Sequence, residues 1–287
     1  MTFMNHFSLV APTIAEQHEM TERFNLPAYF MHEATDINAR PKLEQEGGHQ
    51  LLVIHLPYVD QQVTDSSMDV KYRTLPFSMI LTGDTLITVC SEKTALSFDH
   101  RTHTANILGI LHQTAVDYIQ LTQQIESEIT AAEDELSRSY RNPELYRLLY
   151  LNESLLCMAT ALKQMRHMMR KLEKGQLLLM HKQDQDIFMD TLVELDQAYA
   201  ITEISQLNAN NVMDAYGNII QNNVSHVVKL LTAVTIVLSI PTLIASIYGM
   251  NVPLPFQTAD NAFYVLILVM MVASLGVAGL FWRKHYF

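Results

Sequence analysis

Two long stretches without charge near the C-terminal end constrain this chain more than any other feature. Leu230–Tyr248 contains no charged residue, and neither does Ala262–Trp282. A helix of about 20 residues crosses the hydrocarbon core of a bilayer, and within that core every backbone polar group has to be paired. We therefore expect two membrane-spanning helices, at about residues 227–248 and 262–282, and the lipid bilayer as a partner.

The charges around these stretches predict the orientation of the spans. Arg283 and Lys284 follow the second stretch directly, while residues 251–261 contain no Lys or Arg. The excess of basic residues on cytoplasmic segments then places both termini in the cytoplasm of a multi-pass protein of the cell (inner or plasma) membrane. The first 20 residues carry Glu16 and Glu19 and have no basic start followed by an apolar core, so we expect no cleavable signal peptide.

The part of the chain before the spans is long enough for a soluble domain and is acidic. The net charge of the 287 residues is −11, which argues against nucleic acid as a partner, since phosphate binding needs clustered Lys and Arg. The negative charge of this part favours cations as partners, or it only increases solubility. The two cysteines, Cys90 and Cys157, are far apart and indicate neither a disulfide framework nor a thiolate metal site.

The N-terminal region has the pattern of a mixed α/β domain. Gly83-Asp84 is a hairpin-type turn, and short helices are expected before Ala39 and around Ser91–Phe98. Three segments are rich in strand-forming residues: Leu51–Val59, Phe77–Leu81 and Thr85–Cys90.

From about Thr104 the pattern becomes helical. Asn142-Pro143 ends one helix and starts the next, and Gly175 ends the second. A third helix begins near Asp184 and shows no break before Pro241. Two adjacent apolar rows of the first helix are formed by Leu111, Tyr118, Ile125 and Ala132 and by Ala115, Ile129 and Leu136.

These patterns predict an α+β cytosolic domain with long helices, followed by two transmembrane helices. We expect four segments: an α/β domain (1–103), a helical hairpin (104–183), a stalk helix (184–226) and a membrane domain (227–287).

Hydroxyl residues follow one face of the first span. They are separated by 3, 4, 3 and 4 positions, and they are Thr232, Thr235, Ser239, Thr242 and Ser246. The same face continues toward the cytosol through Ser225, Asn222, Asn218 and Asp214. A row of polar side chains within a membrane needs a water-filled environment, so we expect several copies to enclose a pore. A close helix–helix contact is the alternative.

The outer end of this face carries Tyr248-Gly249-Met250-Asn251. With Val228–Thr232, Pro241–Ser246 and the basic tail, this motif resembles the CorA magnesium transporter family, whose signature is Gly-Met-Asn at the end of the first of two C-terminal spans. The resemblance implies a funnel-shaped homopentamer for passive Mg²⁺ uptake, with some tolerance of cobalt or nickel.

The same resemblance assigns roles to individual residues. Gly249, Met250 and Asn251 would form the selectivity filter, and Val228 and Leu231 a hydrophobic gate. The other pore-lining residues would be Asp214, Asn218, Asn222, Ser225, Thr232, Thr235, Ser239, Thr242 and Ser246. Lys229, Arg283 and Lys284 would form a basic belt at the inner membrane face, although ordinary snorkelling to lipid phosphate explains them equally well.

The chain departs from the family pattern at two places. Many relatives place a methionine near the depth of Ser239, so here the gate must rest on Val228 and Leu231. Many also carry a glutamate early in the external loop, where this chain has Val252–Pro255 and its only acid is Asp260.

Three carboxylates at the start of the third helix predict a regulatory Mg²⁺ site. Asp186, Asp190 and Glu194 are four positions apart, so they share a face and repel unless a cation neutralises them. In the family, acids near this point meet an acid of the neighbouring subunit, for which Asp65, Asp69, Asp84 and Asp99 are candidates. A solvated acidic face is the alternative.

Two other functions remain open. A zinc transporter of the same architecture is one, although the polar face offers oxygen ligands and lacks the His and Cys that Zn²⁺ prefers. A membrane-anchored coiled-coil sensor without transport is the other. The sequence contains no GxSxG, P-loop, HExxH or GxGxxG motif in a credible context, so we expect no enzyme.

Overall fold

The computed structural model describes residues 5–63, 69–92, 96, 102–139, 142–175, 182–257 and 260–284. The chain divides into two compact units, Met1–Met213 and Asp214–Phe287, which are described separately. The elements are β1 (Asn5–Val10), α1 (Ile14–Phe24), α2 (Ala28–Thr35), β2 (Lys42–Glu46), β3 (His49–Val59), β4 (Tyr72–Thr82), β5 (Thr85–Cys90), α3 (His103–Ser139), α4 (Asn142–Gly175), α5 (Lys182–Tyr248) and α6 (Ala262–Arg283).

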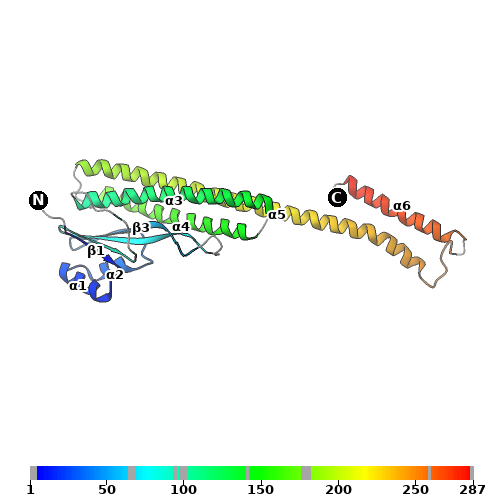
Figure 1. The fold of residues 1–287 in the computed structure, drawn as a ribbon, viewed down its shortest axis with the longest axis horizontal. Helices are drawn as coiled ribbons and strands as arrows, with labels where there is room; N and C mark the ends of the chain where they lie inside the picture. The colour runs from blue at the N-terminus through cyan, green and yellow to red at the C-terminus, as the bar shows by residue number, and fades with distance from the viewer. Residues whose placement is uncertain are drawn as a thin grey trace. The chain divides into compact units, whose positions relative to one another are not determined.

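The first unit contains one sheet (Figure 1), with the strand order β1-β5-β4-β3-β2. β1 pairs with β5 in parallel, and all the other neighbours are antiparallel. The turn between β4 and β5 contains Gly83 with φ +53°, a left-handed conformation that glycine adopts without a steric penalty. The predicted hairpin at Gly83-Asp84 is therefore confirmed.

Helices cover both faces of this sheet, with α1 and α2 on one side and the long helices on the other (Figure 1). Leu51 and Val53 of β3 pack with Phe30 and Met31 of α2 in one core cluster. Leu52 and Ile54, which point to the opposite face of β3, are also buried. Coverage of both faces explains why β3 has an unbroken apolar run rather than alternating polar and apolar residues.

The long helices pack through the predicted apolar rows and through a few polar contacts. All seven residues of the two rows on α3 are at most 2% exposed. The Thr122 and Thr202 hydroxyls, both buried, are 2.9 Å apart across the α3–α5 contact. The Ser205 hydroxyl donates to the Glu126 carboxylate at 2.5 Å. These contacts fix the first part of α5 to α3 within the first unit, which we also call the soluble unit.

The α+β class, three predicted strands and the long helices are confirmed. Two strands were missed, because β1 is short and half exposed and β2 has the charged sequence Lys42–Glu46. Such edge strands lack the apolar pattern that reveals a buried strand. The expected helix around Ser91–Phe98 falls mostly outside the described residues.

His55 is a titratable group inside the soluble unit. Its Nε2 lies 2.7 Å from the Ala39 carbonyl oxygen, so Nε2 carries the hydrogen, and Nδ1 lies 3.3 Å from the Thr74 hydroxyl. Burial lowers the pKa of His55, and the hydrogen bond to Ala39 opposes this effect only in part. The unfolded chain therefore takes up this proton first, at about pH 6.5.

We expect the folded protein to lose stability as the pH falls through about 6.5, until the pH passes the lowered pKa of folded His55. His55→Gln keeps a donor for the Ala39 carbonyl but cannot be protonated. The thermal midpoint in detergent should then drop less between about pH 7.5 and about pH 5.5 in this variant than in the wild type. The exposed His32→Gln is the matched control, and equal drops in all three proteins would contradict the assignment.

Candidate ion pathway along α5

Two helices of the second unit meet the length and composition of membrane spans. The outer part of α5 reaches a mean hydropathy of 2.2 and α6 reaches 2.5. Between Lys229 and Arg283 the only charged residue is Asp260, in the connecting loop. Pro241 lies inside α5 and lines, with Ile267, Met271 and Ser274 of α6, an open apolar pocket of about 420 Å³.

The face of α5 turned toward α6 is apolar. In the outer half of α5, Ala233 is buried at 1% exposure. The half-buried residues that continue this face at helical spacing are Val237, Ile240, Pro241, Ile244 and Tyr248. At about 100° per residue, their mean direction lies roughly half a turn from that of the hydroxyl residues.

The hydroxyl residues are consequently on the side of α5 that α6 leaves open. All five of Thr232, Thr235, Ser239, Thr242 and Ser246 are exposed within the single chain. A contact with the chain's own second span is thereby excluded as the reason for the row. The partner of this face has to come from water, lipid or another copy.

Several of these hydroxyls donate to their own helix. Thr232, Thr235 and Thr242 donate to the carbonyl four residues earlier, at 2.8, 2.8 and 3.1 Å, and Ser239 donates to the Ile236 carbonyl at 2.8 Å. Each hydroxyl oxygen retains lone pairs. The face therefore presents mainly acceptors, which is the polarity that a cation or its hydration water needs.

The spacing of 3 and 4 residues extends over the whole row and includes a residue that the sequence analysis missed. The row is Asp214, Asn218, Gln221, Ser225, Val228, Thr232, Thr235, Ser239, Thr242, Ser246 and Gly249. Gln221 is exposed, and the same spacing rule would have found it. Asn222 and Leu231, both exposed, flank this row. Val228 is its only large apolar member and is 56% exposed.

The helix ends at the Gly-Met-Asn motif. The Gly249 amide donates to the Ala245 carbonyl at 2.9 Å, and the Met250 amide to the Ile247 carbonyl at 3.2 Å. A Cβ at Gly249 would lie 3.3 Å from the Ala245 carbonyl oxygen, which is closer than most Cβ contacts. Asn251 follows directly and is exposed. Glycine thus keeps the last turn of α5 open next to the Asn251 amide.

Basic residues mark the opposite end of the helical hairpin. Lys229 lies 19 positions before the end of α5, and Arg283 lies 21 positions after the start of α6. Because the same loop joins the end of α5 to the start of α6, Lys229 and Arg283 lie at similar distances along the two helices from that loop. Lys229, Arg283 and Lys284 are all exposed, as expected for a belt or for snorkelling side chains.

The three acids proposed for regulation lie at the start of α5, in the first unit. Asp186 and Asp190 are exposed and Glu194 is half-buried, whereas Phe188 and Leu195 face the core. Among the described residues, no three His, Cys, Asp or Glu side chains lie close enough together to hold a metal ion. A metal at these acids would thus require groups from elsewhere.

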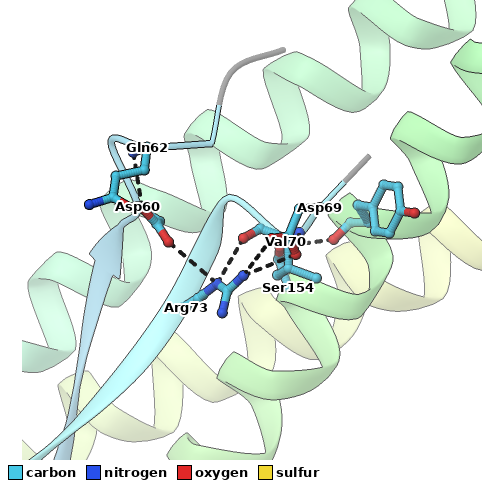
Figure 2. A network of polar contacts seen from close by, with 7 residues as sticks. Asp60, Gln62, Asp69, Val70, Arg73 and Ser154 are labelled. Atoms are coloured by element: carbon cyan, nitrogen blue, oxygen red, sulfur yellow. Dashed lines mark hydrogen bonds and ion pairs between the residues drawn. The ribbon is translucent and has the colours of Figure 1, made fainter. Parts of the chain in front are cut away.

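Two of the four candidate partner acids, Asp65 and Asp99, fall outside the described residues. Asp69 is bound by Arg73, with both carboxylate oxygens within 3.0 Å of one guanidinium nitrogen, and Arg73 also faces Asp60 at 3.8 Å (Figure 2). Asp84 is exposed in the β4–β5 turn. Arg73 already neutralises Asp69, so Asp84 is the more available of the two.

Comparison with known proteins reveals a family resemblance along nearly the whole chain. A family model described as "CorA-like Mg2+ transporter protein" matches residues 4–284. The cobalt/magnesium transport protein CorA of Methanocaldococcus jannaschii is 21% identical, over 96% of this chain and 89% of that protein.

Solved structures share the fold. The complete CorA magnesium transporter of M. jannaschii has a TM-score of 0.83 at 18% identity, covering 98% of this chain and 91% of that chain. The ZntB cytoplasmic domain of Vibrio parahaemolyticus has a TM-score of 0.60 at 9% identity, covering 78% of this chain and 92% of that chain.

Proposed function

The chain belongs to the CorA family of divalent cation transporters, and from this premise we propose that it forms a homopentameric channel for passive Mg²⁺ uptake. One observation carries the proposal: a row on α5, polar at every position from Thr232 to Ser246, that faces away from α6 and leads to Gly249–Asn251. Two spans per chain cannot enclose a pore, so several copies have to place their rows around one axis. Five copies follow from the family resemblance.

The Asn251 side chains would form a ring of amide oxygens at the outer entrance. Mg²⁺ gives up its inner water reluctantly, and a ring of neutral acceptors binds the hydrated ion through that water. A ring of carboxylates would hold the ion more tightly and slow its release. Backbone carbonyls near Gly249 would add acceptors, while Met250 and Tyr248 would shape the entrance.

The gate would lie at the inner end of the span. Val228 is the large apolar residue of the row and Leu231 flanks it, both more than half exposed in the single chain. Five copies of these side chains would close a narrow, dry constriction. Asp214, Asn218 and Gln221 would then form polar rings on the cytosolic side, where they meet the departing ion.

The row favours Mg²⁺ over Zn²⁺. The residues of the row offer hydroxyl, amide and carboxylate oxygens and include no His or Cys, the ligands that Zn²⁺ prefers. Transport of Zn²⁺, or of Co²⁺ or Ni²⁺, is the alternative, and the fold similarity to the ZntB domain is compatible with it. Both termini would be cytoplasmic, with Lys229, Arg283 and Lys284 at the inner face.

Membrane potential is sufficient to drive uptake. Moving one elementary charge through 100 mV releases about 2.3 kcal/mol, so a divalent cation gains about 4.6 kcal/mol. The described residues contain no nucleotide-binding motif, and this drive requires none.

Asn251→Ala tests the filter. We expect Mg²⁺ flux into liposomes to fall at least about tenfold, equivalent to about 1.4 kcal/mol, because the variant removes the amide ring without touching the helix faces. Asn261→Ala, which removes an exposed amide at the other end of the same loop, is the matched control. Wild-type flux and Mg²⁺/Zn²⁺ selectivity in Asn251→Ala would rule out the filter assignment.

Asp190 would act as a sensor of cytosolic Mg²⁺. Bound Mg²⁺ would neutralise the repulsion among Asp186, Asp190 and Glu194 and join them to an acid of a neighbouring copy. Asp84 is our candidate for this acid, because it is exposed in the β4–β5 turn. Loss of the ion would loosen this contact at the start of the helix that also carries Val228 and Leu231. A low internal Mg²⁺ concentration would thereby open the channel.

In membrane patches, we expect Asp190→Ala to need a higher internal Mg²⁺ concentration for closure, and Asp190→Lys to reduce flux by mimicking the occupied site. Gln185→Ala, an exposed neutral change on the same helix, should behave as the wild type. If Asp190→Ala channels close at the wild-type Mg²⁺ concentration, Asp190 is not the sensor.

A further inference from the structure

The external loop contains a tight turn with an unusual residue at its apex. The Gln257 amide donates to the Leu254 carbonyl at 3.3 Å, and the Gln257 side-chain oxygen accepts from the Leu254 amide at 3.1 Å. Pro255 and Phe256 occupy the two central positions. Pro255 is favourable there, because its ring fixes the φ that the first central position of such a turn requires.

Phe256 is unfavourable in this turn. Its φ is +63°, the left-handed value that the second central position of a type II turn requires and that Gly or Asn normally supplies. A bulky residue in this conformation is a backbone outlier, and such strain is retained where the surroundings or the function demand it. The turn itself gives no reason for an aromatic side chain at this position.

The Phe256 side chain is also largely exposed. It is 81% exposed in the single chain, and Val252 of the same loop is 44% exposed. Phe263 and Tyr264, at the start of α6, are 68% and 73% exposed. We call these four side chains, which lie in the loop and the first turn of α6, the outer patch; Asp260 is the only charged residue between Lys229 and Arg283. An exposed apolar patch of this kind needs a partner.

The position of the turn favours lipid as that partner. The patch lies within a few residues of the outer ends of both spans, where aromatic side chains gather at the membrane–water boundary. The Tyr248 hydroxyl donates to the Pro255 carbonyl at 3.2 Å. Tyr248 belongs to the face of α5 turned toward α6, opposite the hydroxyl row. If the row faces a central axis, an orientation that rests on the proposed function, the turn lies on the peripheral side.

We propose that the outer patch, with Phe256 at its tip, inserts into the outer leaflet of the bilayer at the headgroup boundary. Insertion gives the aromatic side chain a role at a position that favours glycine. The Tyr248–Pro255 hydrogen bond then ties this anchored turn to the end of α5 beside Asn251. The patch is a lipid contact that holds the entrance loop at a fixed height.

Fluorescence quenching tests this contact without measuring transport. The chain has one tryptophan, Trp282, so Phe256→Trp in a Trp282→Phe background carries a single indole at the tip of the patch. The full-length protein is placed in phosphatidylcholine vesicles with acyl chains brominated near the headgroup, and iodide is added separately. Tyr146→Trp in the same background, at an exposed aromatic of α4 in the soluble unit, is the matched control.

We expect the brominated lipid to remove most of the emission of Phe256→Trp and almost none of that of Tyr146→Trp, and iodide to show the opposite preference. Val252→Trp samples the same patch without occupying the left-handed position, and should follow Phe256→Trp even if that variant folds poorly. Quenching of the loop variants by iodide alone would place the patch in water. Protection from both quenchers would place it against a neighbouring copy, and either result overturns the proposal.

Discussion

Hydrocarbon offers no hydrogen-bond partner to a polar side chain, and the outer half of α5 carries a continuous row of them. The rest of the second unit is consistent with this constraint. α6 covers the apolar face of α5 that contains Ala233 and Ile244 and leaves the hydroxyl row free. The hydroxyls donate to their own helix and present acceptor oxygens outward. The proposed cation pathway, shared by several copies, would give this row an aqueous environment.

One helix links this row to the soluble unit. α5 is continuous from Lys182 to Tyr248, and its first part is fixed to α3 by the Thr122–Thr202 and Ser205–Glu126 contacts. Arg166 of α4 adds an ion pair to Asp196 and lies 4.4 Å from the ring centre of Tyr199. These contacts anchor the start of α5, so the proposed sensor acids and the proposed gate belong to one element. Ion binding at Asp190 would act on the gate through that element.

Much of this organisation could be predicted from the sequence, because it depends on periodicity. The spans, the α3 rows and the hydroxyl row all repeat at helical spacing, and the buried strands β3 and β5 have long apolar runs. The edge strands could not be found, because half-exposed residues such as Lys42 and Glu44 carry no apolar pattern. The left-handed backbone conformation of Phe256 could not be predicted either, since sequence rules expect Gly or Asn at that position. The direction of the hydroxyl row relative to α6 could not be predicted, because it depends on how α5 and α6 pack against each other.

Thiol accessibility tests most directly whether the row lines a water-filled pathway. In a Cys90→Ala, Cys157→Ser background, single cysteines replace Thr235, Ser239 and Thr242 of the row, Val237 and Ile244 of the α6-facing side, and Val234 of an exposed apolar side. A charged, membrane-impermeant thiol reagent is added on both sides of the vesicles at low Mg²⁺. The account predicts rapid modification at Thr235→Cys, Ser239→Cys and Thr242→Cys and little at the other three positions. Inert cysteines along the row, or equal reaction on all faces, would contradict it.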